Sequence, residues 1–143
     1  MSFKDKIPAI AVTAILIGGV AVVTSNMFGG KSDGVPVDVI VPNLSAEAKT
    51  GEAIFASNCA ACHGSNASGS ENGPPLVHTI YNPGHHGDEA FALAATRGVR
   101  QHHWKFGNMP PVPDFSIADA KPIVTYIREL QRANGIFYKP HNM

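Results

Sequence analysis

Residues 59–63 read Cys59-Ala60-Ala61-Cys62-His63, and this stretch carries the most specific chemistry in the chain. Its two cysteines are the only ones among 143 residues. Two thiols one helical turn apart can reach the two vinyl groups on one edge of a haem, and the adjoining imidazole can then ligate the iron. We therefore expect one covalently bound haem c, attached through Cys59 and Cys62, with His63 as an axial iron ligand.

Two other interpretations of a C-x-x-C pair are a thiol redox pair and half of a zinc site. Zinc would need a second pair of ligands at its own spacing. A thioredoxin-like redox pair is typical of a βαβ pattern, which this sequence does not show. Both are weaker than the haem interpretation.

Length and composition predict one small domain beyond an apolar N-terminus. The chain has 14 glycines and 11 prolines, and a bound haem would give so short a sequence an apolar face to pack on. It has 11 Lys/Arg and 11 Asp/Glu, so its formal net charge is zero. Without a basic surplus, nucleic acid is not expected as a partner.

Residues 1–30 are predicted to be an N-terminal membrane anchor or a signal sequence. No charged residue occurs from Ile7 to Gly30, and Lys4 and Lys6 stand just before this run. Such a run is long enough for one transmembrane helix, and the lysines predict a cytoplasmic N-terminus. We expect a single pass through a bacterial inner (cytoplasmic) membrane with the haem domain in the periplasm. Cleavage near Val23-Thr24-Ser25 would instead release a soluble periplasmic protein.

Residues 31–43 are interpreted as a tether between the anchor and the domain. Gly29–Gly34 is polar and glycine-rich, and Val35–Pro42 alternates apolar residues between prolines, which predicts an extended segment. Gly29–Pro42 could hold the domain away from the bilayer or let it swing between partners.

Three helices are expected, so the fold class is all-α. The first is Ala46–Asn58, with Ser45 as its N-cap. The second is Asp88–Arg97, which we expect Asp88 to cap and Gly98 to end.

The third helix has an apolar stripe with i, i+3, i+4, i+7 spacing, formed by Ile123, Tyr126, Ile127 and Leu130. Its N-cap is expected to be Ser116 or Asp119, and its end is Asn134-Gly135. Because proline is tolerated only in a first turn, Pro122 places the start of the regular helix near Asp119 or Ala120.

Gly51, Phe55 and Cys59, each four residues apart, resemble the first helix of class I cytochromes c. The resemblance covers roughly residues 44–136, taken as the cytochrome c domain, and leaves residues 137–143 as a tail without an assigned role. It implies that the first and last helices cross at Gly51 and Phe55, over a haem core. A small residue at the crossing lets two helix backbones approach closely.

The resemblance also implies two further groups at the haem. Gly73-Pro74-Pro75-Leu76 is similar to the family's turn in which a proline carbonyl accepts a hydrogen bond from the ligand histidine, so Pro74 is expected to orient His63. Met109, followed by Pro110, matches the methionine that is the second axial ligand.

Haem propionates need hydrogen-bond donors. Arg97, Arg100 and Trp104 are candidates, since a guanidinium or an indole N–H can donate to a carboxylate. For Trp104, simple core packing is an equal alternative.

Two histidine pairs, His85-His86 and His102-His103, depart from the family pattern. Three interpretations stay open. They are exposed histidines hydrogen-bonded to solvent, backbone or a propionate, a second metal site for copper or zinc, or a distal iron ligand.

The resemblance implies an electron-transfer protein, not an enzyme, that shuttles single electrons between periplasmic or membrane redox partners of a respiratory chain. One alternative is a small haem enzyme or sensor of peroxide or gas, which would require a labile sixth ligand. Another is a haem-plus-copper module that uses the histidine pairs.

Overall fold

The computed structural model describes residues 36–140, which are mostly helical and contain two isolated β-bridges but no strand. The elements are α2 (Ala46–Asn58), α3 (Ala60–His63), η1 (Ser65–Ala67), η2 (Thr79–Tyr81), α4 (Asp88–Arg97) and α5 (Ile117–Ala133). In this part of the chain the expectation of an all-α fold is confirmed. The predicted anchor, residues 1–30, lies outside the described residues. Within residues 36–140 no helix has the length and apolar character needed to cross a membrane.

Helix α2 has the predicted bounds and the predicted cap. The Ser45 hydroxyl accepts a hydrogen bond from the Ala48 N–H at 3.2 Å. It also donates to a carboxylate oxygen of Glu129 in α5 at 2.7 Å, and the Ser45 N–H donates to the other oxygen at 3.0 Å. One residue thus caps α2 and joins it to the last helix.

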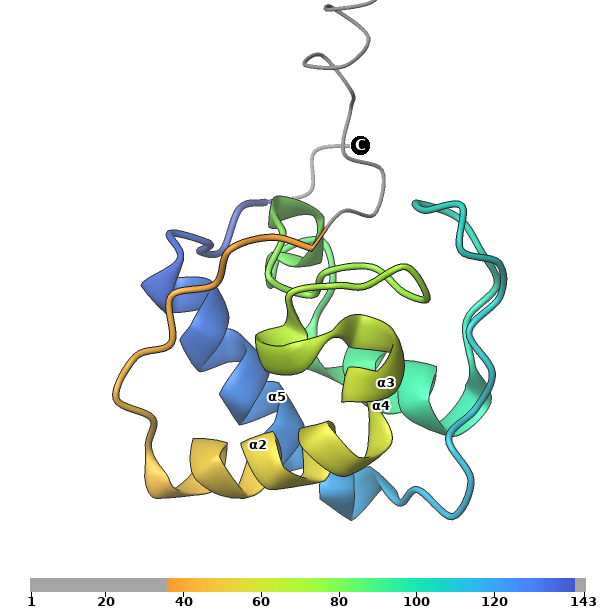
Figure 1. Ribbon diagram of the computed structural model, residues 1–143, viewed down its shortest axis with the longest axis horizontal. Coiled ribbons are helices and arrows are strands. Elements are labelled where there is room, and N and C mark those ends of the chain that lie inside the picture. Colours follow the sequence, from red (N-terminus) through yellow and green to blue (C-terminus); the bar gives the residue numbers. More distant parts are fainter. Residues whose placement is uncertain (1–35, 141–143) are drawn as a thin grey trace, which may run out of the picture. The chain divides into compact units, whose positions relative to one another are not determined.

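Helices α2 and α5 cross as the family resemblance implied (Figure 1). Gly51 lies at the crossing, where an added Cβ would collide with the Pro122 carbonyl and lie 2.8 Å from the Ile123 nitrogen. One turn later the Phe55 and Tyr126 rings pack with centroids 5.7 Å apart. The absence of a side chain at Gly51 therefore sets how closely the helices approach.

The predicted start of α5 is wrong. The helix begins at Ile117, because Ser116 and Asp119 form a capping box in which each side chain binds the other residue's backbone N–H. Pro122 consequently lies in the second turn rather than the first. It removes one backbone donor there, a cost that the two capping bonds and the buried stripe offset.

Helix α4 has the predicted bounds, but its N-cap is Gly87 and not Asp88. Asp88 is the first helical residue, and its carboxylate accepts a hydrogen bond from Arg128 Nε at 2.8 Å. The Asp88 carboxylate, which the local sequence predicts to cap the helix, therefore forms a long-range ion pair with Arg128 instead.

Residues 36–43 are extended, as expected, but they do not form a spacer. The Val37 N–H donates to the Ser68 carbonyl at 2.8 Å. Asn134 Oδ1 accepts a hydrogen bond from the Ile40 N–H, and Asn134 Nδ2 donates one to the Ile40 carbonyl, both at 2.9 Å. This larger part of the predicted tether is fixed to the domain because its backbone groups are hydrogen-bonded there.

The buried core joins α2, α5 and the loops between them. Its members are Leu44, Ala48, Phe55, Ala67, Leu76, Val77, Ile123, Tyr126, Ile127, Leu130 and Ile136. Phe55, Ile123 and Ile127 also face a cavity beside this core.

Candidate functional site

The attachment stretch lies where α2 ends and α3 begins. Cys59 leaves the helical conformation (φ −122°, ψ −32°), although its N–H still donates to the Phe55 carbonyl. Gly64, with φ +72°, ends the single turn of α3. Cys59 is half-buried and Cys62 is exposed.

Burial, together with the neighbouring Cys62, raises the pKa of the Cys59 thiol to about 11. The nucleophilic cysteine of a thiol redox pair has a lowered pKa, because the thiolate is the reactive form. The environment of Cys59 therefore disfavours the redox-pair interpretation.

His63 is buried, and its Nδ1 lies 2.9 Å from the Pro74 carbonyl oxygen, which is the hydrogen bond that the family resemblance implied. When Nδ1–H donates to this carbonyl, Nε2 carries the lone pair. Burial lowers the pKa of His63, against the opposing effect of this hydrogen bond. The imidazole is thus held neutral and in the tautomer that a metal ligand requires.

A cavity of about 490 Å³ lies beside the attachment stretch. Its wall includes Cys59, Cys62, His63 and Met109. Apolar side chains from α2, α4 and α5 line much of the rest, among them Phe55, Phe91 and Ile127. A volume of this size is typical of cofactor sites, which range over about 300–1,000 Å³.

Met109 enters this cavity wall from a loop that is tied down at its base. The Val99 N–H donates to the Met109 carbonyl and the Met109 N–H donates to the Val99 carbonyl, both at 2.9 Å. The backbone of Met109, which carries the thioether, is therefore held in place because both its N–H and its carbonyl are hydrogen-bonded to Val99.

Trp104 has a buried indole nitrogen without a hydrogen-bond acceptor of good geometry among the described residues. The indole N–H interacts with the Tyr81 hydroxyl without forming a well-aligned hydrogen bond, so a bound group beside the cavity can supply a better acceptor. A haem propionate is such an acceptor. Together with two thiols, an imidazole and a thioether around one apolar cavity, this donor shows that the residues present fit a haem c.

The two arginines predicted to contact the propionates, Arg97 and Arg100, lie in different positions relative to the cavity. Arg97 lines the cavity, whereas Arg100 is not part of its wall. The Arg100 carbonyl instead accepts a hydrogen bond from His102 Nδ1 at 2.8 Å. Because this hydrogen bond does not involve the Arg100 guanidinium, Arg97, Arg100 and Trp104 all stay predicted propionate contacts.

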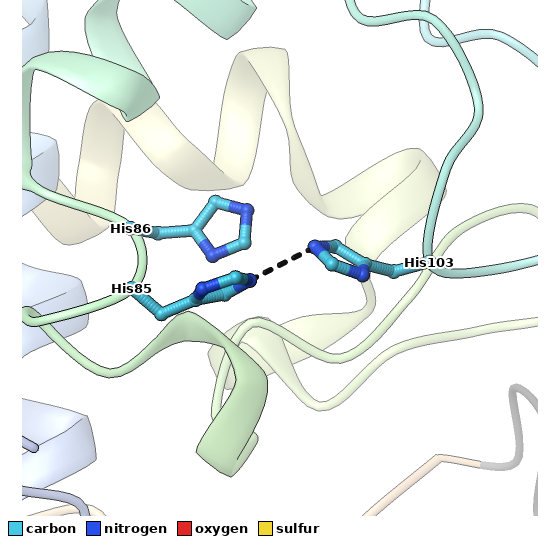
Figure 2. A group of neighbouring side chains, drawn as sticks. All are labelled: His85, His86 and His103. Atoms are coloured by element: carbon cyan, nitrogen blue, oxygen red, sulfur yellow. Dashed lines mark hydrogen bonds between the residues drawn. The ribbon is translucent and has the colours of Figure 1, made fainter. Parts of the chain in front are cut away.

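The two histidine pairs come together beside the cavity. One ring nitrogen each of His85, His86 and His103 lie within 4.8 Å of one another. Figure 2 shows the first two rings facing the third, and the His85 and His103 Nε2 atoms are 3.2 Å apart. His102 adjoins the group, with its ring centroid 4.1 Å from that of His103.

A buried arginine that the sequence analysis missed holds this region together. Arg128 Nη1 donates to the Tyr81 carbonyl at 2.8 Å and to Gln131 Oε1 at 2.6 Å, and Nη2 donates to the His86 carbonyl at 2.6 Å. The sequence signal was slight, since Arg128 and Gln131 each follow a residue of the apolar stripe by one position.

The Cytochrome c family model matches residues 48–131, a segment that contains the attachment cysteines, His63, Pro74 and Met109. A comparison with curated proteins gives no match. The matched family implies haem c as cofactor and haem-based electron transfer with redox partner proteins. With more than half of the sequence matched, and with a cavity that joins the motif cysteines to His63 and Met109, this chain belongs to the cytochrome c family.

Proposed function

We propose that the protein is a single-electron carrier of the class I type, with one covalent haem c ligated by His63 and Met109. The observation that carries the proposal is that both residues line one cavity and that each is constrained by its own hydrogen bonds. Fixed axial ligands suit a carrier, since a coordination shell that stays the same on oxidation and reduction needs little reorganisation.

When bound, the haem supplies reversible one-electron exchange at its iron. The protein's residues hold and shield it. Pro74 orients His63, the Val99 pairing positions Met109, and the apolar wall excludes water. Trp104 and Arg97 offer donors to the propionates.

Electrons need a short route to the surface. Cys62 is exposed, so the haem edge bonded to it would lie near solvent. We propose that partners dock at this edge. Redox encounters of this kind are weak and transient, and a chain of zero formal net charge should associate with modest salt dependence.

The proposed setting is the periplasmic side of a bacterial inner membrane, with respiratory-chain partners. The uncharged run from Ile7 to Gly30, preceded by Lys4 and Lys6, supports it. Membrane fractionation of the full chain tests the anchor, and a mature N-terminus near Ser25 would replace it with a soluble periplasmic form.

The central experiment compares optical spectra of the purified parent and Met109→Ala in both oxidation states. The parent should show the ferric sulfur-to-iron charge-transfer band and bind no exogenous ligand, and the variant should lose the band and bind imidazole or cyanide readily. Met143→Ala, in the tail, is the control and should match the parent. A parent without the band, or with an iron open to peroxide or gases, would favour the haem enzyme or sensor function.

A further inference from the structure

The cluster formed by His85, His86 and His103 is not explained by the electron-carrier function. Two of its members precede α4, and the third lies in the loop after α4, 18 residues further along the chain than His85. The ring centroids of His85 and His86 lie 5.1 Å and 5.2 Å from that of His103. Three imidazoles from two loops therefore share one small volume.

The geometry points to a second metal site: we propose that the imidazoles of His85, His86 and His103 bind one transition-metal ion of the copper and zinc class. The site uses neither His63 nor Met109, so it stands or falls separately from the proposed function.

The separations of the ring nitrogens suit such an ion. Two nitrogens that are each about 2.05 Å from a tetrahedral zinc are about 3.3 Å apart. The His85 and His103 Nε2 atoms are already 3.2 Å apart, and the third nitrogen lies within 4.8 Å of both. Rotation of the side chain that moves this third nitrogen by about 1.5 Å would bring it to a ligand distance. This is a small movement for a half-buried imidazole.

The tautomers of His86 and His102 are suitable as well, whereas the hydrogen bond between His85 and His103 places a hydrogen on one Nε2, which a bound metal ion would displace. His86 Nδ1 lies 2.9 Å from the Ile80 carbonyl oxygen, so it is the donor and Nε2 carries the lone pair. His102 Nδ1 donates in the same way to the Arg100 carbonyl at 2.8 Å. Metal-ligating histidines characteristically donate their other ring N–H to a backbone carbonyl. His102, beside His103, is accordingly the candidate for a fourth ligand.

The backbone that carries the first two histidines is held in place from two sides. Arg128 donates to the His86 carbonyl at 2.6 Å. The Lys139 N–H donates to Asn82 Oδ1 at 3.2 Å, which fixes the preceding turn to the segment after α5. The guanidinium is itself paired with Asp88 at 2.8 Å, so its charge opposes a bound cation less. Such support is what a preorganised site requires.

The donor set selects the class of metal. Only imidazole nitrogens belong to the cluster, and imidazole suits copper and zinc, whereas magnesium and calcium prefer oxygen ligands. Cu(II) should bind more tightly than Zn(II), following the usual order of divalent metal affinities.

The test is calorimetric titration of chelator-treated holoprotein with Cu(II), and in a second series with Zn(II). The parent should bind one equivalent of each. His85→Gln and His103→Gln should each weaken binding at least tenfold, whereas Lys105→Gln, an exposed change on the same loop, should leave it unchanged. The Cu(II) form should show hyperfine splitting from imidazole nitrogens in its electron paramagnetic resonance spectrum.

Three results would overturn the proposal. They are no stoichiometric binding to the parent, unchanged affinity in the His85→Gln/His103→Gln double variant, or a changed haem absorption spectrum in either single variant. The last would place one of these histidines on the haem iron. Haem absorption and thermal unfolding report whether each variant folds, and His85→Gln carries the test if His103→Gln does not.

Discussion

The backbone of Gly51 in α2 lies directly against the carbonyl group of Pro122 in α5. A Cβ at this position would overlap the carbonyl and lie 2.8 Å from the Ile123 nitrogen. The contact joins two backbones, neither of which can rotate away as a side chain would. It therefore fixes the spacing of the helices that form the core beside the cavity.

Gly51→Ser should destabilise the protein by about 2 kcal/mol or more, since overpacking outweighs the gain in helix propensity. Chemical denaturation of the holoprotein measures the loss. Gly87→Ser is the matched control, because there an added Cβ meets only the flexible Glu89 carboxylate, at 3.1 Å, and serine is a favourable N-cap. Equal stabilities for the two variants would contradict the close crossing.

Arg128→Met should cost about 3 kcal/mol of stability. The change leaves the His86 carbonyl without its donor, and it leaves the Tyr81 carbonyl with only the longer hydrogen bond from Gln131 Nε2, at 3.2 Å. Arg128→Lys should recover little, because one ammonium cannot reproduce the fork of donors.

Arg132→Met, one turn further along α5 and exposed, serves as the control and should change stability by no more than about 0.5 kcal/mol. The comparison is made by urea unfolding monitored by circular dichroism. A cost for Arg128→Met as small as that of the control would mean that water satisfies these carbonyls.

Trp104→Phe keeps an aromatic ring but removes the buried N–H. If that N–H donates to a propionate, the variant should lose about 2 kcal/mol of stability, as for hydrogen bonds to charged groups. Its haem potential should also fall, because the propionate charge becomes less well compensated. Chemical denaturation measures the loss of stability, and potentiometric titration measures the change in potential. Tyr138→Phe, an exposed aromatic change, is the control. A more stable variant with an unchanged potential would indicate that Trp104 only packs in the core.

The capping box of α5 predicts a pH-dependent contribution to stability. Hydrogen bonds from the Ser116 hydroxyl and N–H hold the pKa of Asp119 below its ordinary value of 3.8. Its stabilisation is therefore complete well above pH 3.8 and disappears as the pH falls through the lowered pKa. The Tm difference between the parent and Asp119→Asn should be present at neutral pH and vanish in strong acid. A difference that is independent of pH would exclude the charged cap.

Much of the site follows from local chemistry. The spacing of Cys59, Cys62 and His63 predicts a haem attachment site, because the distances along one helical turn match one edge of the porphyrin. Ser45 caps α2 for an equally local reason. The Pro74 carbonyl was expected only through resemblance to a family, yet its hydrogen bond to His63 is present at 2.9 Å.

Local reasoning failed where distant residues compete. Asp88 is a good N-cap, but Arg128, 40 residues away, binds its carboxylate, and Gly87 caps α4 instead. Val37 and Ile40 were predicted to belong to a spacer. Their hydrogen-bond partners, Ser68 and Asn134, are distant in the chain, and the sequence does not reveal them. Pro122 suggested a later start for α5, but the capping box and the buried stripe outweigh one missing hydrogen bond.

The sequence by itself determined the attachment motif and the three main helices, since each rests on spacing within a few residues, whereas Met109 was expected through the family resemblance. Only the tertiary structure decided which histidines meet. The sequence offers two adjacent pairs, but neighbouring side chains in a pair need not face one ion. The turn held by Arg128 and the loop after α4 bring His85, His86 and His103 together, because backbone groups far apart in the chain are satisfied there at the same time.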